Sequence, residues 1–238
     1  MAAHPADHPG PFAFVDDLDQ PALSPDDRHH LERARRLRAG DALVLGDGAG
    51  RWRPARFGPR LDPTGAIQET APATPAIGVA FALVKGDKPE LVVQKLTELG
   101  VDRIVPFHAA RSVVRWDAAR SAKATGRLRA VARSAAEQCH RPWLPAVDDV
   151  TDLGTLLAAG CIALADRTGE APSLAHPLVA VGPEGGWAPE ERAAAAQAGA
   201  AAVAVGPHVL RSETAAVTVG ALLAALRAGL IGEVTEGG

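Results

Sequence analysis

From residue 77 onward, short runs of apolar residues alternate with longer segments in which apolar residues recur at helical spacing. Apolar runs of about four to eight residues are typical of strands that are covered on both faces of a sheet. We expect such strands at Ile77–Val84, Val101–Phe107, Cys161–Ala165, Leu178–Val181 and Ala201–Val205. The pattern therefore predicts a largely parallel sheet for this part of the chain.

The segments between these runs predict helices. Pro89–Leu99 places apolar side chains at helical spacing and stops at Gly100, a residue typical of helix C-termini. Further helices are expected at Ala118–Gln138, Thr151–Ala158, Ala188–Ala198 and Thr214–Leu226. Strands and helices in alternation indicate an α/β fold whose sheet carries helices on both faces.

A different pattern precedes residue 77. Pro72 and Pro75 interrupt the chain between residues 70 and 76, which indicates a domain boundary. Upstream of it we expect a helix at His29–Leu37 and strands at Phe12–Val15, Asp41–Leu45 and Trp52–Phe57, the last two joined as a hairpin around Gly46–Gly50. The expected domains are a small β-rich domain at residues 1–72 and an α/β domain at residues 73–238.

The chain carries 25 Lys and Arg against 28 Asp and Glu, and this net charge of −3 argues against a general affinity for nucleic acid. The charge is unevenly distributed, however. Residues 33–60 carry eight arginines and two aspartates (+6), residues 103–141 nine basic and two acidic residues (+7), and residues 142–238 four arginines and eleven acidic residues (−7). One basic cluster is typical of a solvated surface, whereas two clusters, one in each expected domain, favour RNA or DNA as partner.

Other features disfavour several classes of protein. Cys139 and Cys161 are too few for a disulfide framework and lack the paired spacing of a zinc site, so we expect no metal. The N-terminal residues lack the basic segment followed by an apolar stretch that is typical of a signal peptide. No apolar run approaches the about 20 residues that a membrane span requires. We therefore expect a soluble cytoplasmic protein without a membrane partner.

Two strand-to-helix connections carry the residues best suited to ligand binding. Leu178–Trp187 passes from an apolar run into Gly-Pro-Glu-Gly-Gly, and Ala201–Ala216 passes through Gly206 into Leu-Arg-Ser-Glu-Thr. Glycines permit close approach of a ligand to the backbone, and ligands of α/β proteins bind beyond the carboxyl ends of strands. Each connection is also compatible with a tight structural turn, so this pattern alone leaves the ligand open.

Gly-Pro-Glu-Gly-Gly and Leu-Arg-Ser-Glu-Thr-Ala together resemble the knotted SPOUT class of methyltransferases, and specifically the ribosomal RNA small subunit methyltransferase E family. Further motifs of that family occur in the same order along nearly the whole chain. They are His29-His30-Leu31, Arg36-Leu37 before Gly40-Asp41, Lys85-Gly86-Asp87-Lys88, Gln94-Lys95 before Glu98–Val101, Arg111-Ser112, and Glu137-Gln138 before Arg141 and Pro145. Their order and spacing carry the resemblance, rather than any single motif.

The resemblance implies an N-terminal PUA-like RNA-binding β-barrel and a C-terminal α/β domain with a deep trefoil knot, a rare exception to unthreaded connections. It implies a homodimer that transfers a methyl group from S-adenosylmethionine to N3 of a uridine in 16S rRNA of the small ribosomal subunit. By position, the implied cofactor-binding residues are Leu164, Gly182, Pro183, Glu184, Gly185, Gly186, Val205, Gly206, Leu210, Arg211 and Ser212. A loop around Leu164–Asp166 is expected to supply the third wall of the cofactor pocket.

Methylation at N3 requires that the uracil N3 proton leaves and that the developing anion is stabilised. Arg211 suits the stabilisation because its guanidinium is always charged; the alternative is an ion pair with Glu213 or Glu184 that only shapes the loop. Glu213 is a candidate base, or alternatively an acidic residue that favours the N-terminus of a helix.

Candidate contacts to the substrate RNA are basic side chains from both expected domains. They are Arg36, Arg38, Lys85, Arg111, Arg115 and Arg141. Two alternative functions remain open at this point. One is a SPOUT methyltransferase that acts on another RNA such as tRNA, and the other is a non-catalytic RNA-binding protein of ribosome assembly.

Overall fold

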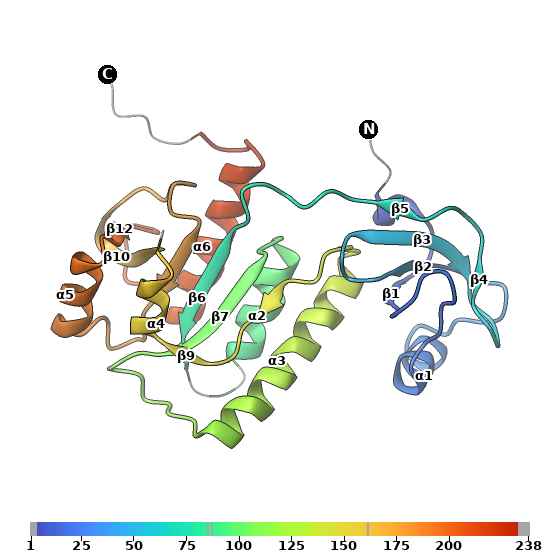
Figure 1. Ribbon diagram of the computed structural model, residues 1–238, viewed down its shortest axis with the longest axis horizontal. Coiled ribbons are helices and arrows are strands. Elements are labelled where there is room, and N and C mark those ends of the chain that lie inside the picture. Colours follow the sequence, from blue (N-terminus) through green and yellow to red (C-terminus); the bar gives the residue numbers. More distant parts are fainter. Residues whose placement is uncertain (1–3, 85, 87, 161, 233–238) are drawn as a thin grey trace. The chain divides into compact units, whose positions relative to one another are not determined.

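The computed structural model describes residues 4–84, 86, 88–160 and 162–232. These residues form two compact units. One unit consists of Met1–Ala73 together with Arg133–Leu144, and the other of Thr74–Ala132 together with Pro145–Gly238. Figure 1 labels most of the helices and strands, and we describe each unit by itself.

The first unit contains a five-stranded sheet and a short 3-10 helix, η1 (Pro5–Asp7). Its strands are β1 (Phe12–Phe14), β2 (Ala42–Gly46), β3 (Arg51–Arg56), β4 (Asp62–Pro63) and β5 (Gln68–Glu69). β2 and β3 form the predicted antiparallel hairpin, while β1 pairs with β2 in parallel. The hairpin turn is stabilised by Asp47, whose Oδ1 accepts hydrogen bonds from the N–H groups of Ala49 and Arg51 at 2.8 and 3.1 Å.

The helix of the first unit, α1, spans Pro25–Arg33 and not the predicted His29–Leu37. Ser24 caps its N-terminus, because the Ser24 hydroxyl accepts a hydrogen bond from the Asp27 N–H at 3.0 Å. Arg36 has a φ of 58°, which lies outside the right-handed helical region and prevents extension to residue 37. The cap and the proline that follows it, rather than the apolar pattern, set where this helix begins.

The last turns of the long helix α3 (Ala118–Gln138) belong to the first unit. Arg133 donates a hydrogen bond to the Phe14 carbonyl at 2.9 Å and pairs with Asp27 at 3.2 Å. Glu137 accepts a hydrogen bond from the Phe14 N–H at 3.3 Å, and Ala136 is fully buried in an apolar cluster of this unit. Strand β1 is therefore stabilised by residues that lie more than a hundred positions later in the sequence.

Seven strands form the sheet of the second unit, and every pair between them is parallel, as the sequence predicts. They are β6 (Gly78–Ala82), β7 (Arg103–His108), β8 (Ala146–Val147), β9 (Thr151–Asp152), β10 (Ile162–Glu170), β11 (Leu178–Val181) and β12 (Ala201–Val203). The order across the sheet is β12-β10-β11-β6-β7-β8, with β9 beside β7. Cys161, the first residue of one predicted strand, lies outside the described residues.

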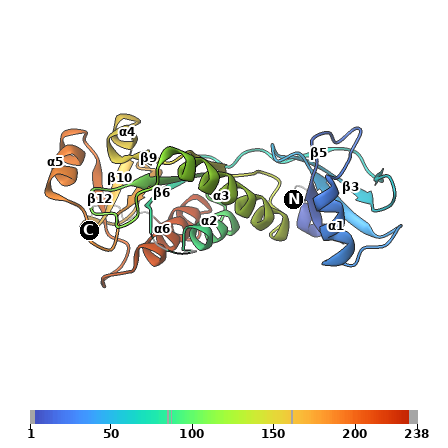
Figure 2. The same ribbon diagram turned by 90° about the horizontal axis from the view of Figure 1, so that it is seen from below.

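Helices cover both faces of this sheet (Figure 2). They are α2 (Lys88–Glu98), the part of α3 before residue 133, α4 (Leu153–Ala158), α5 (Pro189–Gln197) and α6 (Ser212–Arg227). Leu96 of α2, Leu128 of α3 and Leu223 of α6 pack in the apolar cluster of one face, whereas Leu156 of α4 and Ala195 of α5 pack in the cluster of the other. No helix among the described residues is both long and apolar enough to cross a bilayer.

The observed helices agree with the predicted segments to within a few residues, and α3 coincides with Ala118–Gln138. The predicted helix at Thr151–Ala158 begins two residues later, as α4. Thr151 and Asp152 instead form β9, which pairs with β7. Asp152 also caps α4, because its Oδ1 accepts a hydrogen bond from the Thr155 N–H at 2.8 Å.

Candidate functional site

The first loop of the site follows β11, whose four residues are all buried. After Gly182-Pro183-Glu184-Gly185-Gly186, the chain reaches Trp187 and then α5. Trp187 is 5% exposed; its indole N–H donates to the Ala165 carbonyl of β10 at 2.9 Å, and its ring stacks on Phe107. Gly186 has a φ of 67°, a conformation that side-chain-bearing residues rarely adopt. We call residues 182–187 the first loop.

The second loop follows β12 and comprises residues 204–211, after which α6 begins at Ser212. Ser212 connects the two loops, because its hydroxyl donates a hydrogen bond to the Gly182 carbonyl at 3.0 Å. Ser212 is 5% exposed, so this hydrogen bond is shielded from water. The loops that follow β11 and β12 are therefore joined at one edge of the parallel sheet, as the sequence predicts, although β10 lies between the two strands.

The third wall comes from β10, and here the expected loop around Leu164–Asp166 is wrong. The strand continues to Glu170. The pairing with β12 shifts within it, since Ala165 and Glu170 both face Val203. This irregularity, which we call the β-bulge, leaves the residues between the two positions without a pairing partner on β12. The residues between the two pairing positions, 166–169, thus provide the wall from within an irregular strand.

These three segments surround one cavity of about 420 Å³. Its lining comprises residues 165–168 of β10, residues 181–184, 186 and 187 around the first loop, residues 205, 206 and 208–210 of the second loop, Arg192 of α5, and Ser212 and Ala215 of α6. The cavity lies where β10, β11 and β12 end or bend. This is the position at which parallel α/β sheets bind ligands.

Most of the predicted cofactor residues lie around this cavity: Gly182, Pro183, Glu184, Gly186, Val205, Gly206, Leu210 and Ser212. Three others do not line it. Leu164 is buried in the sheet on the opposite side from Ala163, and Gly185 is exposed beside Arg111. Arg211 is exposed immediately before α6, where it occupies the N-cap position with an extended backbone.

Charged side chains lie close together beside the first loop. Lys88, at the start of α2, lies 3.4 Å from the Glu184 carboxylate and 3.1 Å from the Glu213 carboxylate. Burial by itself raises the pKa of Glu213, but its own backbone N–H and the Lys88 ammonium outweigh burial, and the net effect is a lowered pKa. Lys88 therefore favours the charged form of Glu213, and its two ion pairs link α2 to the first loop and to α6.

Another acidic side chain lies within the cavity wall. Asp166 accepts hydrogen bonds from the backbone N–H and the hydroxyl of Thr168 at 3.0 and 2.9 Å, and it pairs with Arg192 at 2.9 Å. The Thr168 N–H is the strongest of the contacts that lower the pKa of Asp166. Asp166 thus presents a fixed negative charge at the β-bulge.

The predicted RNA contacts are distributed over both units. Arg36 and Arg38 are exposed in the first unit, which also contains the half-buried Arg141. Arg111 and Arg115 are exposed in the second unit, in the segment between β7 and α3. Lys85 lies outside the described residues.

Sequence reasoning missed several residues of the cavity. Trp187, Arg167, Thr168, Arg192 and His208 all line it. Trp187 directly follows the glycines of the first loop, and this position in the sequence could have identified it as a residue of the cavity. Arg167 and Thr168 carried no signal, because the bulge that exposes them depends on pairing with β12. No cluster of His, Cys, Asp or Glu suited to hold a metal ion occurs among the residues that the structure describes.

Comparison with known families gives two matches. Residues 72–224 match a family described as an RNA methyltransferase domain, and residues 23–58 match one described as an RNA methyltransferase PUA domain. A ribosomal RNA small subunit methyltransferase E from Mycobacterium bovis is 39% identical to the chain over 220 residues, which cover 83% of the chain and 83% of the relative. The sequence similarity therefore extends well beyond the two loops.

Solved structures agree with this similarity. A ribosomal RNA small subunit methyltransferase E from Neisseria gonorrhoeae, bound to S-adenosyl methionine, aligns with a TM-score of 0.76 at 28% identity and covers 91% of this chain and 97% of that chain. A Legionella pneumophila methyltransferase structure with the bound cofactor SAM aligns with a TM-score of 0.79 at 27% identity and covers 90% and 96%. The fold described above is thus similar to that of methyltransferases solved with this cofactor.

Proposed function

The chain belongs to the ribosomal RNA small subunit methyltransferase E family, and from that premise we propose that it transfers a methyl group from S-adenosylmethionine to N3 of a uridine in 16S rRNA. The observation that carries the proposal is the convergence of both predicted cofactor loops on one cavity. Gly182 and Gly206 follow different strands, yet both line it, and Ser212 joins the two loops.

The cavity fits the cofactor by size and by chemistry. Its volume of about 420 Å³ lies within the range of small-molecule sites, about 300–1,000 Å³. Val181, Val205 and Leu210 offer apolar walls suited to a purine ring. Asp166 and Thr168 offer polar groups suited to ribose hydroxyls. These residues, with the backbone of Gly182 and Gly206, would hold the cofactor, which supplies an electrophilic methyl group on a sulfonium centre.

Arg211 is the proposed stabiliser of the uracil anion. The alternative of an ion pair with Glu184 or Glu213 has less support, because Lys88 pairs with both carboxylates and Arg211 forms no ion pair with either among the described residues. The charge of Arg211 does add, more weakly than Lys88, to the lowering of the pKa of Glu213. A guanidinium donates a fork of N–H groups, and such a fork suits a carbonyl oxygen that gains negative charge as N3 loses its proton.

Glu213 remains the second proposed catalytic residue. Because its pKa is lowered, Glu213 is a weaker proton acceptor than an ordinary glutamate. We therefore expect it to act through its negative charge rather than by accepting the N3 proton. It lies in the first turn of α6, where a negative charge is favourable. Through Lys88, it also helps to fix the position of the first loop.

The RNA-binding part of the proposal involves both units. We propose that Arg36, Arg38 and Arg141 of the first unit, and Arg111 and Arg115 of the second, contact phosphates. Lys85 belongs to the same proposal by its sequence motif alone. Since phosphate contacts release counterions, binding should weaken steeply as salt increases.

The remaining parts of the proposal concern assembly and context. They are a PUA-like domain at residues 1–72, a methyltransferase domain with a trefoil knot at residues 73–238, a homodimer, and a cytoplasmic location. Light scattering on the purified protein tests the dimer, and a single-copy mass would refute it.

The methylated position is tested on small ribosomal subunits from a bacterial strain that lacks its own methyltransferase of this family. Purified protein and methyl-labelled S-adenosylmethionine are added, and reverse transcription locates the modification, since a methyl group on N3 blocks base pairing. We expect one stop at a uridine of 16S rRNA. Label in tRNA would instead indicate another RNA target, and absence of cofactor binding by calorimetry would indicate a non-catalytic RNA-binding protein.

A further inference from the structure

The first loop needs an external constraint on its conformation. A cofactor that contacts backbone groups requires those groups at fixed positions before it binds. One turn within the loop is closed by the Gly186 N–H, which donates to the Pro183 carbonyl at 2.8 Å. Gly182, Gly185 and Gly186 restrict the backbone less than other residues do, so this one hydrogen bond does not fix the whole loop. Neighbouring segments supply the further constraint.

The segment after β7 forms a compact turn next to the first loop. The Ser112 N–H donates to the Ala109 carbonyl at 3.0 Å, and the Ala109 N–H donates to the Ser112 hydroxyl at 3.2 Å. Ala109 and Ser112 are 2% and 8% exposed. We call residues 109–112 the bracing turn, because its ends are buried and its own hydrogen bonds define its shape.

Arg111 extends from this turn to the middle of the first loop. Its guanidinium donates a hydrogen bond to the Gly185 carbonyl at 3.0 Å. The two backbones also lie close together, since a Cβ added to Gly185 would lie 3.3 Å from the Cβ of Arg111. A Cβ at position 185 would therefore require the loop or the turn to move by a few tenths of an ångström. This close approach favours a glycine at position 185, although the residue does not line the cavity.

Glu191 connects the same turn to the end of the first loop. One carboxylate oxygen accepts a hydrogen bond from the Ala110 N–H at 2.8 Å, and the other accepts one from the Ala188 N–H at 2.9 Å. Ala188 occupies the N-cap of α5 but has no side-chain acceptor. Glu191 therefore accepts a hydrogen bond from a backbone N–H at the start of α5 and also fixes that end of the helix against the bracing turn.

We infer that Arg111 and Glu191 are positioning residues that hold the first loop in the conformation that binds the cofactor. The inference rests on the proposed function, because it takes the first loop as part of the cofactor site. It gives Arg111 a role in addition to the proposed RNA contact. Arg111, a proposed RNA contact, thereby also affects the affinity for S-adenosylmethionine.

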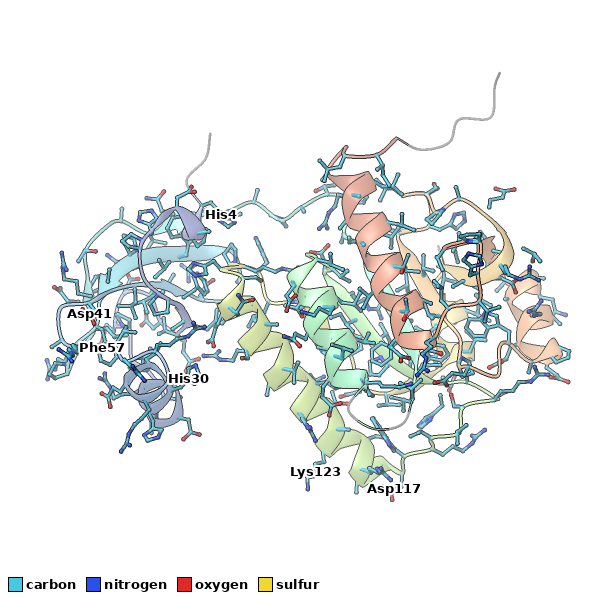
Figure 3. The ribbon with its side chains drawn as sticks, turned by 180° about the vertical axis from the view of Figure 1, so that it is seen from behind. His4, His30, Asp41, Phe57, Asp117 and Lys123 are labelled. Carbon is cyan, nitrogen blue, oxygen red and sulfur yellow. The ribbon has the colours of Figure 1, made fainter. Side chains whose placement is uncertain are left out.

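The test measures the cofactor site without RNA. Arg111→Ala, Arg111→Lys and Glu191→Ala are compared with Lys123→Ala, which removes an exposed positive charge near the start of α3 (Figure 3). Calorimetry gives the Kd for S-adenosylmethionine, and hydrogen exchange on the cofactor-free protein reports the amides of residues 182–188. We expect Arg111→Ala and Glu191→Ala to raise the Kd by about tenfold and to accelerate exchange, as loss of a hydrogen bond to a charged group does.

The controls separate this role from the others. Arg111→Lys retains a donor, but a flexible ammonium places it less exactly at the Gly185 carbonyl than the planar guanidinium does, so its Kd should lie between those of wild type and Arg111→Ala. Lys123→Ala should leave both readouts unchanged. If Arg111→Ala and Glu191→Ala retain the wild-type Kd and exchange rates, the inference is wrong, even where Arg111→Ala weakens RNA binding.

Two further outcomes are also decisive. If wild-type protein binds no S-adenosylmethionine, the proposed function fails, while exchange of residues 182–188 still decides whether the turn holds the loop. If circular dichroism shows that Arg111→Ala does not fold, Arg111→Lys and Glu191→Ala provide the answer.

Discussion

The first and second loops line the same cavity but are held very differently. Three side chains from outside the first loop bond to it: Lys88 to the Glu184 carboxylate, Arg111 to the Gly185 carbonyl, and Ser212 to the Gly182 carbonyl. In addition, the loop's own Trp187 donates to the Ala165 carbonyl of β10. Among the described residues, no side chain makes a hydrogen bond or ion pair with residues 206–210 of the second loop, and Val209 is 89% exposed. One wall of the cavity is therefore fixed in advance, and the other depends on few contacts.

This difference indicates a division of labour between the two loops. A fixed wall lowers the entropy cost of binding a small molecule, because its groups are already in position. A wall with few contacts adjusts at little cost, which suits the entry of a large substrate. We expect changes in the first loop to affect folding and cofactor affinity, and changes at the second loop to affect the methyl transfer itself.

The largest effect is expected for Trp187→Ala. Trp187 is 5% exposed and connects the first loop to β10, so its removal leaves a cavity and an unpaired carbonyl. We expect the free energy of unfolding to fall by about 3–5 kcal/mol, measured by urea denaturation. Val209→Ser in the second loop is the matched control and should change it by less than about 0.5 kcal/mol. Equal losses for the two variants would contradict the comparison.

Arg211→Ala at the end of the second loop should reduce the rate of methyl transfer by about 100-fold or more, because a donor to the developing anion is lost. Arg211 is exposed, so we expect the free energy of unfolding and the Kd for S-adenosylmethionine to stay near wild type. Single-turnover kinetics with small subunits measure the rate. Near-normal turnover would remove Arg211 from the mechanism.

Ser212→Ala breaks the hydrogen bond that joins the two loops. Because Ser212 is 5% exposed and its hydroxyl donates to the Gly182 carbonyl, the variant leaves that carbonyl unpaired. We expect a loss of about 1–2 kcal/mol in the free energy of unfolding. Hydrogen exchange should also become faster in the first loop. Faster exchange confined to the second loop would contradict this expectation, because it would show that Ser212 stabilises the second loop and not the first.

The smallest effect concerns the β10 wall between the two loops and depends on pH. The Thr168 backbone N–H and, less strongly, its hydroxyl lower the pKa of Asp166. A lowered pKa in the folded state stabilises the protein above the usual pKa of aspartate, and this contribution is lost as the pH falls through the folded-state value. Thr168→Val should therefore lower stability by under about 1 kcal/mol at neutral pH.

Comparison of unfolding at about pH 7 and about pH 3 tests this dependence, since the difference between wild type and Thr168→Val should shrink at the lower pH. A difference that is the same at both values would show that the Thr168 hydroxyl acts on packing and not on the charge of Asp166.

Much of the fold follows from local pattern. The buried run at Leu178–Val181 is a strand, and the long basic segment at Ala118–Gln138 is a helix. The predicted strand at Ala201–Val205 is also observed, although it ends two residues earlier, at Val203. These elements are stabilised by apolar periodicity and by end signals that lie within a few residues of one another. The convergence of the two loops was also predictable, because parallel strands end at the same edge of a sheet.

What sequence reasoning missed depends on contacts between distant residues. The bulge in β10 exists because Ala165 and Glu170 both pair with Val203, and no pattern inside β10 encodes it. In the same way, Arg111 is predicted as an RNA contact because it is basic and lies in a basic segment. Its bond to Gly185 becomes visible only when residues 111 and 185 lie side by side.

The discontinuous first unit has a consequence for how the protein is made. Strand β1 and Trp52 leave the ribosome long before Ala136, the residue that packs with them in one buried cluster. The N-terminal unit is therefore completed only after β6, β7 and α2 have been synthesised, although its sheet comes first in the sequence. A fragment that stops at residue 73 would lack this packing and expose apolar surface. Transplanting the unit into another protein thus requires two pieces of chain, and a single cut does not release it intact.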